Sequence, residues 1–321
     1  MAALASRNTP TTLWCRRAGL AEQIDRDHCN GDYLDGFELP SQLRATADLE
    51  EAVRGADLLV VGVPSQNFRG ALEAARPFLR PWVPVLSLAK GLEVGSRLRM
   101  SQIIEEVMPG HPVGALTGQN LAKEILAGQA AASVIAMDDN NVAKAIQHIF
   151  QGDLFRVYTN EDVVGCELGG VLKNVIAIAA GMADGLGAGD NTRAAVITRG
   201  LSEMSRLGIE LGGDPITFSG LAGMGDLVAT CISPQSRNRH VGECLGRGQT
   251  IEEIIDSMNM VAEGVKTSKV VNEIANEMGI DLPIAAEVNA VCHEGRPASE
   301  AYTGLLRRGT GREMDGLTPE R

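Results

Sequence analysis

The first half of the chain alternates short apolar runs with segments of helical periodicity. The clearest run is residues 58–63 (LLVVGV), a continuous apolar stretch typical of a strand that is covered on both faces. Similar runs predict strands at 11–15, 84–89, 113–116, 132–136 and 155–158. Helical spacing predicts helices at 48–55, 101–107, 121–127 and 143–150. This alternation predicts a parallel sheet with helices on both faces.

After about residue 160 the pattern changes to long helical stretches. The longest predicted helices are residues 161–185 and 191–211, and the second carries most of its apolar positions on one face. Shorter helical patterns follow at 251–258, 265–278, 285–291 and 298–306, with no confident strand. The sequence therefore predicts an α/β domain over residues 1–162 and an all-helical domain over 163–321. The polar tail at 312–321 is expected to fray.

Composition narrows the class of protein. With 29 Lys+Arg against 41 Asp+Glu, the net charge is −12, which disfavours general binding to nucleic acid or anionic membranes. The 6 cysteines form no CxxC pair and show no metal-ligand spacing, so they predict reduced thiols in the cytoplasm and no metal. The apolar stretch 165–185 contains three charged residues, which favours a buried helix over a membrane span.

Lys173 is the most informative single residue. It is the only charged side chain between Glu167 and Asp184, inside an apolar helix. A lone buried ammonium is costly unless it is paired or its pKa falls. A lysine with a lowered pKa suits general acid–base chemistry near neutral pH. The alternative is a lysine at the helix edge that extends its ammonium to water.

Other polar groups follow predicted strands. Lys90 ends the strand at 84–89, and ligands of such sheets bind beyond the carboxyl ends of strands. Pro64-Ser65 follows the strand at 58–63 and could line the same crevice. Arg16-Arg17 follow the strand at 11–15, where Arg accommodates the 2′-phosphate of a dinucleotide. Their structural alternatives are a turn lysine, a strand terminator and a surface basic pair.

Two further motifs lie in the helical half. Residues 236–239 (SRNR) place two guanidinium groups beside short polar side chains, which suits a phosphate. Asp226 ends the glycine-rich turn at 220–225 and could accept a hydrogen bond from a substrate hydroxyl or hold Lys173. The structural alternatives are a solvated basic turn for the first motif and a helix cap for the second.

In this order, the motifs resemble those of the bacterial NAD(P)-dependent glycerol-3-phosphate dehydrogenases. The resemblance runs along nearly the whole chain. Its first half includes EAVRGADLLVVGVPS at 51–65, LAKGLE at 88–93 and LTGQNLAKEI at 116–125. Its second half includes residues 155–208, FSGLAGMGDLVATC at 218–231, SRNRHVG at 236–242 and VAEGVKTS at 261–268.

The resemblance implies roles for residues by their position in these motifs. Lys173 resembles the catalytic acid/base, and Lys90 resembles the residue that touches both substrate and cofactor. The other substrate contacts that it implies are Gly118, Asn120, Asp226, Ser236, Arg237 and Asn238. The other cofactor contacts that it implies are Arg16, Arg17, Tyr33, Ala122, Arg237, Val261 and Glu263.

The implied fold is a Rossmann-like sheet domain that binds the dinucleotide, followed by a helical domain that binds the substrate. The implied reaction interconverts dihydroxyacetone phosphate and sn-glycerol 3-phosphate with NAD or NADP, and feeds glycerophospholipid synthesis. Lys173 as an ammonium would protonate the developing alkoxide, and Lys90 would steady its charge. The expected partner is this small phosphorylated substrate; nucleic acid and stable membrane insertion are not expected, and a homodimer stays open.

Two departures from the family pattern leave alternatives open. The family's SGP loop is replaced by Thr117-Gly118-Gln119, and no strand or GxGxxG precedes the first helical segment. We expect Met1 to be an internal methionine, with the strand and the glycine loop encoded upstream in frame. One alternative is a catalytically impaired, truncated paralogue that binds a metabolite or acts as a scaffold. Another is a dehydrogenase of small hydroxy acids, against which the SRNR motif argues.

Overall fold

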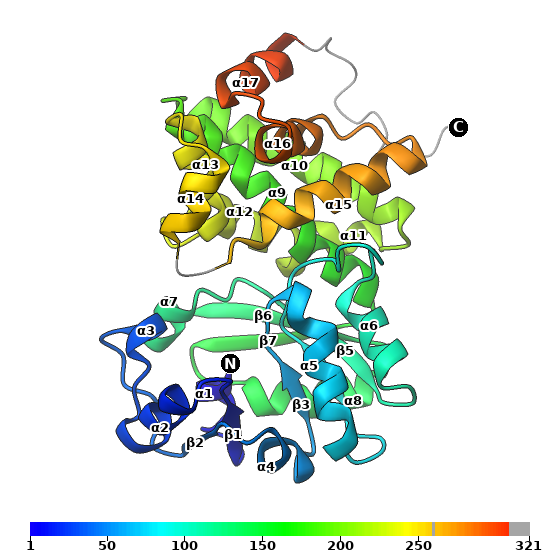
Figure 1. The fold of residues 1–321 in the computed structure, drawn as a ribbon. Helices are drawn as coiled ribbons and strands as arrows, with labels where there is room; N and C mark the ends of the chain where they lie inside the picture. Colours follow the sequence, from blue (N-terminus) through cyan, green and yellow to red (C-terminus); the bar gives the residue numbers. More distant parts are fainter. Residues whose placement is uncertain (259–260, 308–321) are drawn as a thin grey trace. The chain divides into compact units, whose positions relative to one another are not determined.

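The computed structural model describes residues 1–258 and 261–307, and the chain divides into two compact units (Figure 1). The sheet unit comprises Met1–Val63, Asn67–Ala89 and Ser101–Val163. The helical unit comprises Pro64–Gln66, Lys90–Met100 and the described residues from Val164 onward. Two short segments from the first half of the sequence therefore belong to the helical unit. The predicted frayed tail at 312–321 lies outside the described residues.

The sheet unit contains a two-stranded and a five-stranded sheet. In the first, β1 (Thr11–Trp14) pairs in parallel with β2 (Leu43–Thr46). The second has the order β3 (Leu59–Val61), β4 (Val85–Ser87), β5 (Val113–Gly118), β6 (Ala131–Met137) and β7 (Phe155–Asn160). All six strands that the sequence predicted are present, whereas the short strand β2 was missed.

The helices of the sheet unit lie between its strands in the sequence. They are α1 (Ala2–Ala5), α2 (Ala18–Asp27), α3 (Gly31–Leu34), α4 (Leu49–Arg54), α5 (Phe68–Ala75), α6 (Met100–Val107), α7 (Ala122–Leu126) and α8 (Asn140–Phe150). Those predicted at 48–55, 101–107, 121–127 and 143–150 are confirmed as α4, α6, α7 and α8. The buried core of the five-stranded sheet includes Leu86, Ile135 and Phe150, and the two-stranded sheet has a separate cluster around Ile24 and Leu43.

The expectation of a fully parallel sheet is wrong at one pair. Strand β5 pairs with β6 in the antiparallel direction, with Gly118 opposite Ser133, while the other pairs of this sheet are parallel. The chain leaves β5 and re-enters β6 at the same end of the sheet, so α7 is part of an end loop and does not cross a face. Strand periodicity predicts the strands, but it carries no information about this reversal.

The described part of the helical unit contains helices and no strand. Its elements are α9 (Val163–Gly185), α10 (Asp190–Glu210), α11 (Pro215–Phe218), a π turn (Leu221–Gly225), α12 (Asp226–Ile232), α13 (Arg237–Gly246), α14 (Ile251–Ser257), α15 (Glu263–Met278), α16 (Pro283–His293) and α17 (Ala298–Arg307). The sequence predicted α9, α10 and the last four helices, and missed α11, α12 and α13. The glycine-rich turn predicted at 220–225 corresponds to the π turn.

Helix α9 runs through the middle of the helical unit (Figure 1). Every residue from position 165 to 183 is buried. By length and composition, α9 and the segment Pro215–Ile232 could each cross a membrane, but 89% of the apolar window of α9 is buried inside the unit. A core helix passes the same test, and α9 is built as one.

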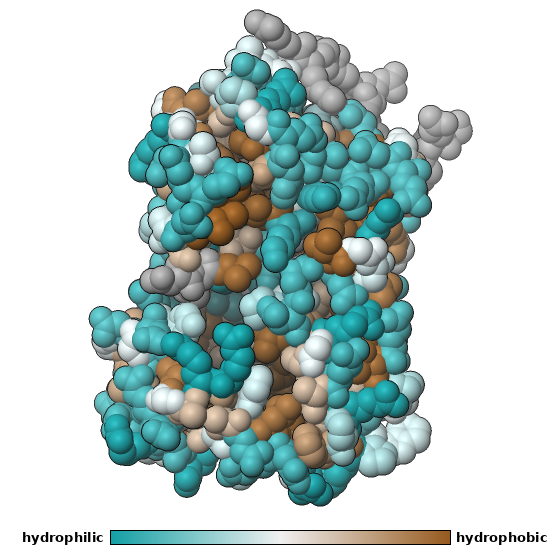
Figure 2. Space-filling model, in the orientation of Figure 1, coloured by the Kyte–Doolittle hydropathy of each residue, from teal (hydrophilic) through white to brown (hydrophobic). Residues whose placement is uncertain are grey.

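On the face shown in Figure 2, hydrophilic side chains predominate.

Glycines allow α9 and α13 to approach each other closely. A Cβ atom on Gly181 of α9 would lie 2.0 Å from the carbonyl oxygen of Arg239, and one on Gly242 of α13 would lie 2.0 Å from the carbonyl oxygen of Ile178. Both obstacles are backbone atoms, which cannot turn away as a side chain can. This contact fixes the beginning of α13 beside the C-terminal half of α9.

We expect Gly242→Ala to lower the free energy of unfolding by about 1–3 kcal/mol, because the added methyl group overpacks a backbone contact. The measurement is urea denaturation. The matched control is Gly19→Ala in α2, where no atom lies within 4 Å of the added Cβ. That variant should be as stable as the parent or more stable, because alanine favours a helix. Equal stability of the two variants would contradict the close packing of α9 against α13.

Candidate functional site

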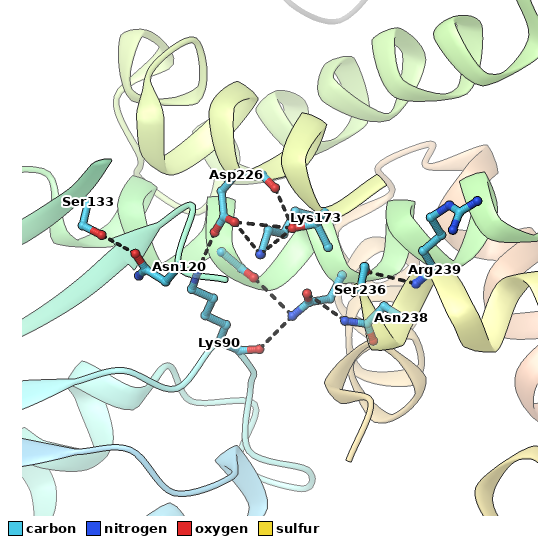
Figure 3. A network of polar contacts seen from close by, with 11 residues as sticks. Lys90, Asn120, Ser133, Lys173, Asp226, Ser236, Asn238 and Arg239 are labelled. Atoms are coloured by element: carbon cyan, nitrogen blue, oxygen red, sulfur yellow. Dashed lines mark hydrogen bonds and ion pairs between the residues drawn. The ribbon is translucent and has the colours of Figure 1, made fainter. Parts of the chain in front are cut away.

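The centre of the site is one buried carboxylate shared by two lysines (Figure 3). Lys173 Nζ donates a hydrogen bond to Asp226 Oδ1 at 2.6 Å, and Lys90 Nζ donates to Asp226 Oδ2 at 2.6 Å. The side chain of Asp226 is 3% exposed, that of Lys173 8% and that of Lys90 19%. The three residues come from α12, α9 and the segment 90–100, all within the helical unit.

The local sequence explains why Asp226 meets Lys173. Gly169 lies one helical turn before Lys173, and a Cβ there would be 2.6 Å from the carbonyl oxygen of Ala222. The π turn that contains Ala222 can therefore lie directly against α9. Asp226 is the first residue of α12, immediately after this turn. The glycines of both segments thus bring the carboxylate to the lysine.

Thr230 completes the surroundings of Lys173, and the sequence analysis missed it. Its Oγ1 accepts a hydrogen bond from Lys173 Nζ at 2.7 Å and donates to the carbonyl oxygen of Asp226 at 2.6 Å. The available signal was spacing, since Thr230 lies four residues after Asp226 and so on the same face of a helix. That signal required α12 to be recognised, and the sequence suggested only a turn there.

Burial and charge set the protonation of this cluster. Burial lowers the pKa of Lys173 to about 8; Asp226 opposes this effect and the nearby ammonium of Lys90 adds to it. For Asp226, burial alone would raise the pKa, but the two ammonium groups hold the pKa of this carboxyl below its usual range. Lys173 can therefore gain and lose a proton near neutral pH beside a carboxylate that stays ionised.

Two asparagines connect this cluster to neighbouring elements. Asn174 Nδ2 donates to the carbonyl oxygen of Lys90 at 3.1 Å, and its Oδ1 accepts from Asn238 Nδ2 at 2.9 Å. Asn238 Oδ1 in turn accepts from the backbone N–H of Gly264 at 2.9 Å. This chain fixes the backbone at Lys90 to α9, α13 and α15. It also orients both amides, because each donor faces an acceptor.

The motif SRNR forms the beginning of α13. Ser236 is the N-cap, and its side chain accepts from the backbone N–H of Arg239 at 3.2 Å. Arg237 is exposed and donates to the carbonyl oxygen of Val261 at 2.6 Å. The guanidinium of Arg239 is committed elsewhere, since it binds the buried carboxylate of Asp184 at 2.7 Å. One arginine of the motif is thus structural, and the other lies exposed at the first position of α13.

Glu263, the first residue of α15, contacts the segment 64–66. Its Oε1 accepts from the backbone N–H of Ser65 at 2.9 Å, and its Oε2 accepts from Ser65 Oγ at 2.5 Å. Val261, two residues before it, is 45% exposed, and its carbonyl oxygen accepts a hydrogen bond from Arg237. The structure therefore brings Glu263, Val261, Arg237 and Asn238 together around the facing ends of α13 and α15.

The remaining predicted residues lie in the sheet unit. Gly118 ends β5 with φ +119°, and a Cβ there would lie 3.0 Å from the carbonyl oxygen of Ala132, so a side chain is disfavoured on both grounds. Asn120 Oδ1 accepts a hydrogen bond from Ser133 Oγ (Figure 3). Ala122 is the first residue of α7. Three of the predicted residues therefore follow one another at the end of β5.

A second group in the sheet unit surrounds Arg17. Its guanidinium binds Asp32 at 2.6 Å and lies 5.7 Å from the centroid of the Tyr33 ring. The side chains of Arg17 and Asp32 are about half exposed, and Arg16 is exposed. Arg17 and Tyr33, which the sequence analysis named separately, thus form one contact. Among residues 1–258 and 261–307, no group of three or more His, Cys, Asp and Glu side chains could hold a metal ion.

Removal of the shared carboxylate tests the cluster. We expect Asp226→Asn to lower the free energy of unfolding by about 3–5 kcal/mol near pH 7, because two ammonium groups lose their counterion. The pKa of Lys173 is about 8 in the folded protein, against the ordinary value of 10.5 in an unfolded chain. Between these two pH values the unfolded chain binds more protons than the folded protein, so stability rises with pH in that window. Above pH 8 neutral Lys173 needs no counterion, and the loss should therefore be smaller near pH 9.

The measurement is urea denaturation at both pH values. The control is Asp256→Asn on α14, where the side chain is exposed and the change should stay within about 0.5 kcal/mol. An Asp226→Asn protein as stable as the parent at pH 7 would show that the two ammonium groups do not depend on this carboxylate.

Comparison with known proteins covers both units. Family models described as the N-terminus and the C-terminus of NAD-dependent glycerol-3-phosphate dehydrogenase match residues 1–143 and 162–303. The chain is 59% identical to glycerol-3-phosphate dehydrogenase (NAD(P)+) 2 from Sphingopyxis alaskensis over 98% of its own length and 94% of that protein. It is 53% identical to glycerol-3-phosphate dehydrogenase (NAD(P)+) from Mycobacterium avium, over 98% of this chain and 93% of that protein.

A solved structure agrees with this likeness. The glycerol-3-phosphate dehydrogenase from Coxiella burnetii superposes with a TM-score of 0.91 at 34% identity, covering 95% of this chain and 94% of that one. Family models, sequence relatives and a solved structure therefore agree on both the Rossmann-like sheet unit and the helical unit. The chain belongs to the NAD-dependent glycerol-3-phosphate dehydrogenase family.

Proposed function

We propose that the chain reduces dihydroxyacetone phosphate to sn-glycerol 3-phosphate, and catalyses the reverse oxidation, with NADH or NADPH. The observation that carries this proposal is Lys173, a buried lysine with a pKa of about 8 that shares one carboxylate with Lys90. Such a group can give a proton to an alkoxide and recover it near neutral pH. Its family supplies the substrate and the cofactor class.

The beginning of α13 is the proposed phosphate site. The first backbone N–H groups of a helix lack partners within the helix and point toward an anion. Arg237, at the first helical position, adds a guanidinium that can bind two phosphate oxygens. Ser236 uses an oxygen lone pair to cap Arg239, which leaves its hydroxyl proton for the phosphate. Asn238 stands next in the helix and carries the bond to Asn174.

The proton step belongs to Lys173. In the reduction, its ammonium protonates the oxygen of the substrate carbonyl carbon as negative charge develops there. Asp226 and Thr230 accept hydrogen bonds from the same Nζ and so hold the ammonium in one place. Lys90 adds a second positive charge on the other oxygen of Asp226. In the oxidation, neutral Lys173 takes the proton from the substrate hydroxyl.

The residues of the sheet unit fit the adenosine end of a dinucleotide. When bound, the nicotinamide supplies or accepts the hydride. In the sheet unit, Arg17 beside the Tyr33 ring offers a cation and an aromatic face to an adenosine ribose or its 2′-phosphate. Arg16 is the second cation there. Asp32 now occupies the Arg17 guanidinium, and a ribose 2′-phosphate would have to take its place.

We assign the other predicted contacts to the two partners of the reaction. Gly118 and Asn120, at the end of β5, are proposed to face the substrate, and Ala122 the cofactor. In the helical unit, Arg237 is proposed to serve both, and Val261 and Glu263 to contact the cofactor. The sheet unit is thus the cofactor-binding domain, and the helical unit the substrate-binding domain. All six cysteines are free thiols, which suits the reducing cytoplasm predicted from the sequence.

The test follows NADPH absorbance with dihydroxyacetone phosphate. We expect Lys173→Met to lower kcat by at least about 100-fold, the lower range for a lost acid–base group. The control is Lys269→Met, an exposed lysine on α15, which should keep the parent's kcat. In the parent, kcat/KM for reduction should fall as pH rises through about 8, because reduction needs the ammonium. For oxidation it should rise over the same range, because that direction needs the neutral amine.

Parallel pH profiles in the two directions would contradict the role of Lys173. A parent that binds dihydroxyacetone phosphate but oxidises no NADPH would instead support the metabolite-binding paralogue.

Cofactor preference tests the role of Arg16 and Arg17. Replacement of both with Ser should raise KM for NADPH more than KM for NADH, because only NADPH carries the 2′-phosphate. We expect a difference of about tenfold or more, in line with about 1.5–3 kcal/mol for a hydrogen bond to a charged group. The measurement is initial rates with each cofactor at saturating dihydroxyacetone phosphate. Equal losses for both cofactors would mean that these arginines do not read the phosphate.

A further inference from the structure

We propose that Ser65 is a positioning residue, which fixes the turn that carries Lys90 and orients the carboxylate of Glu263. This inference rests on the proposed function, in which Lys90 acts beside Lys173. Ser65 is completely buried, with 0% of its surface exposed. It lies in the three-residue segment 64–66, which belongs to the helical unit although its sequence neighbours belong to the sheet unit.

Ser65 donates a hydrogen bond to each carboxylate oxygen of Glu263. The backbone N–H binds Oε1 and the hydroxyl binds Oε2, so the carboxylate is held at two points and cannot rotate. Ser65 Oγ also accepts a hydrogen bond from Gln66 Nε2 at 3.1 Å. A serine hydroxyl can donate once and accept as well, and here it does both. The hydroxyl therefore joins Glu263 to Gln66.

Gln66 extends this connection to the turn after Lys90. Its Nε2 donates to the carbonyl oxygen of Leu92 at 2.7 Å, and its Oε1 accepts from the backbone N–H of Val94 at 3.0 Å. The amide thus fixes two backbone groups of the segment 90–100. Because Ser65 Oγ also accepts from the Nε2 group, the hydroxyl is a third partner that helps to orient the amide.

Gly91 shows how closely the turn lies on Ser65. A Cβ at Gly91 would be 2.5 Å from Ser65 Oγ, 2.7 Å from Ser65 Cβ and 3.0 Å from Glu263 Oε2. Only a glycine fits between them. Lys90, the preceding residue, is held by Asp226 at its ammonium and by Asn174 at its carbonyl oxygen. The contact between Gly91 and Ser65 is a third point at which the turn is held, on the Gly91 side of the Lys90–Gly91 peptide bond.

Loss of the hydroxyl should loosen this third point and one of the two bonds that hold Glu263. Ser65→Ala keeps the backbone bond to Glu263 Oε1 but removes the donor to Oε2 and the acceptor for Gln66. The space beside Gly91 then lets the turn shift, and Lys90 moves with it. A displacement of about 1 Å in a catalytic group can cost about 100-fold in rate. The effect should appear in kcat, because the proposed phosphate contacts at the start of α13 are untouched.

The experiment is a double-mutant cycle with Lys90→Met, followed by NADPH oxidation with dihydroxyacetone phosphate. We expect Ser65→Ala to lower kcat by about 10- to 100-fold, with KM for dihydroxyacetone phosphate changed by less than about threefold. In the Lys90→Met background, the same change should lower kcat by less than about twofold, because Ser65 acts through Lys90. Full additivity in the cycle, or an unchanged kcat in Ser65→Ala, would overturn the proposal.

The matched control is Ser268→Ala on α15. Its hydroxyl is also completely buried and donates to the carbonyl oxygen of Val265 at 2.8 Å, but it does not contact Glu263. We expect it to keep the parent's kcat. A loss equal to that of Ser65→Ala would show that any buried hydroxyl here has the same effect, and so overturn the proposal.

Amide hydrogen exchange supplies a readout that needs no activity. In Ser65→Ala, the Val94 amide should exchange at least about tenfold faster, since its acceptor Gln66 is no longer oriented, while helix α13 stays protected. If the parent shows no turnover, the proposed function fails, and this measurement still decides the role of Ser65. Unchanged exchange at Val94 would overturn the positioning role by itself.

Discussion

The site depends on one constraint: two ammonium groups share a single buried carboxylate. Asp226 has one oxygen for Lys173 and one for Lys90. A buried ion pair is costly to desolvate and is retained only when its geometry and remaining hydrogen bonds are satisfied. Here the second oxygen and the hydroxyl of Thr230 provide those bonds. The arrangement keeps Asp226 ionised while Lys173 stays near the point of losing its proton.

The helical unit builds this constraint from its own residues and two short segments. Lys90 comes from the segment 90–100, and that segment is tied to the unit at its far end as well, where Arg99 binds the buried Glu167 at 2.6 Å. Asn174 holds the backbone of Lys90 from α9. Catalytic charges that are held in place before substrate binds need no rearrangement during the reaction. If Lys90 acts as proposed, the ties on this segment serve the chemistry as well as the fold.

The sequence revealed those features that depend on isolation or periodicity. Lys173 was found because a charge in an apolar helix has few explanations, and α9 was found because it is long. Features that depend on the close approach of two backbone segments were missed. Thr230 can be recognised only once α12 is recognised, and α12 comes directly after a glycine-rich π turn that resembles a loop in the sequence. The reversal between β5 and β6 follows from an end loop that strand periodicity does not encode.

The motif SRNR shows the same limit in one helix. The sequence could not separate its two arginines, because their roles depend on a distant partner. Arg239 is held by Asp184 of α9, while Arg237 donates to the carbonyl oxygen of Val261. The packing of α13 on α9 decides which guanidinium binds the buried carboxylate and which stays at the exposed surface. The roles of Val261 and Glu263 were named from the family resemblance, without knowledge of this packing, and they remain proposals.

The most direct test is the titration of Lys173 itself by NMR, with lysine labelled at the side chain and the resonance assigned by its absence in Lys173→Met. The account predicts one lysine that titrates near pH 8, and a still lower pKa for it in Asp226→Asn, where the favourable carboxylate is gone. If every lysine instead titrates near the ordinary value of 10.5, burial does not bring the pKa of Lys173 near neutral pH, and the proposed proton step has no group to carry it.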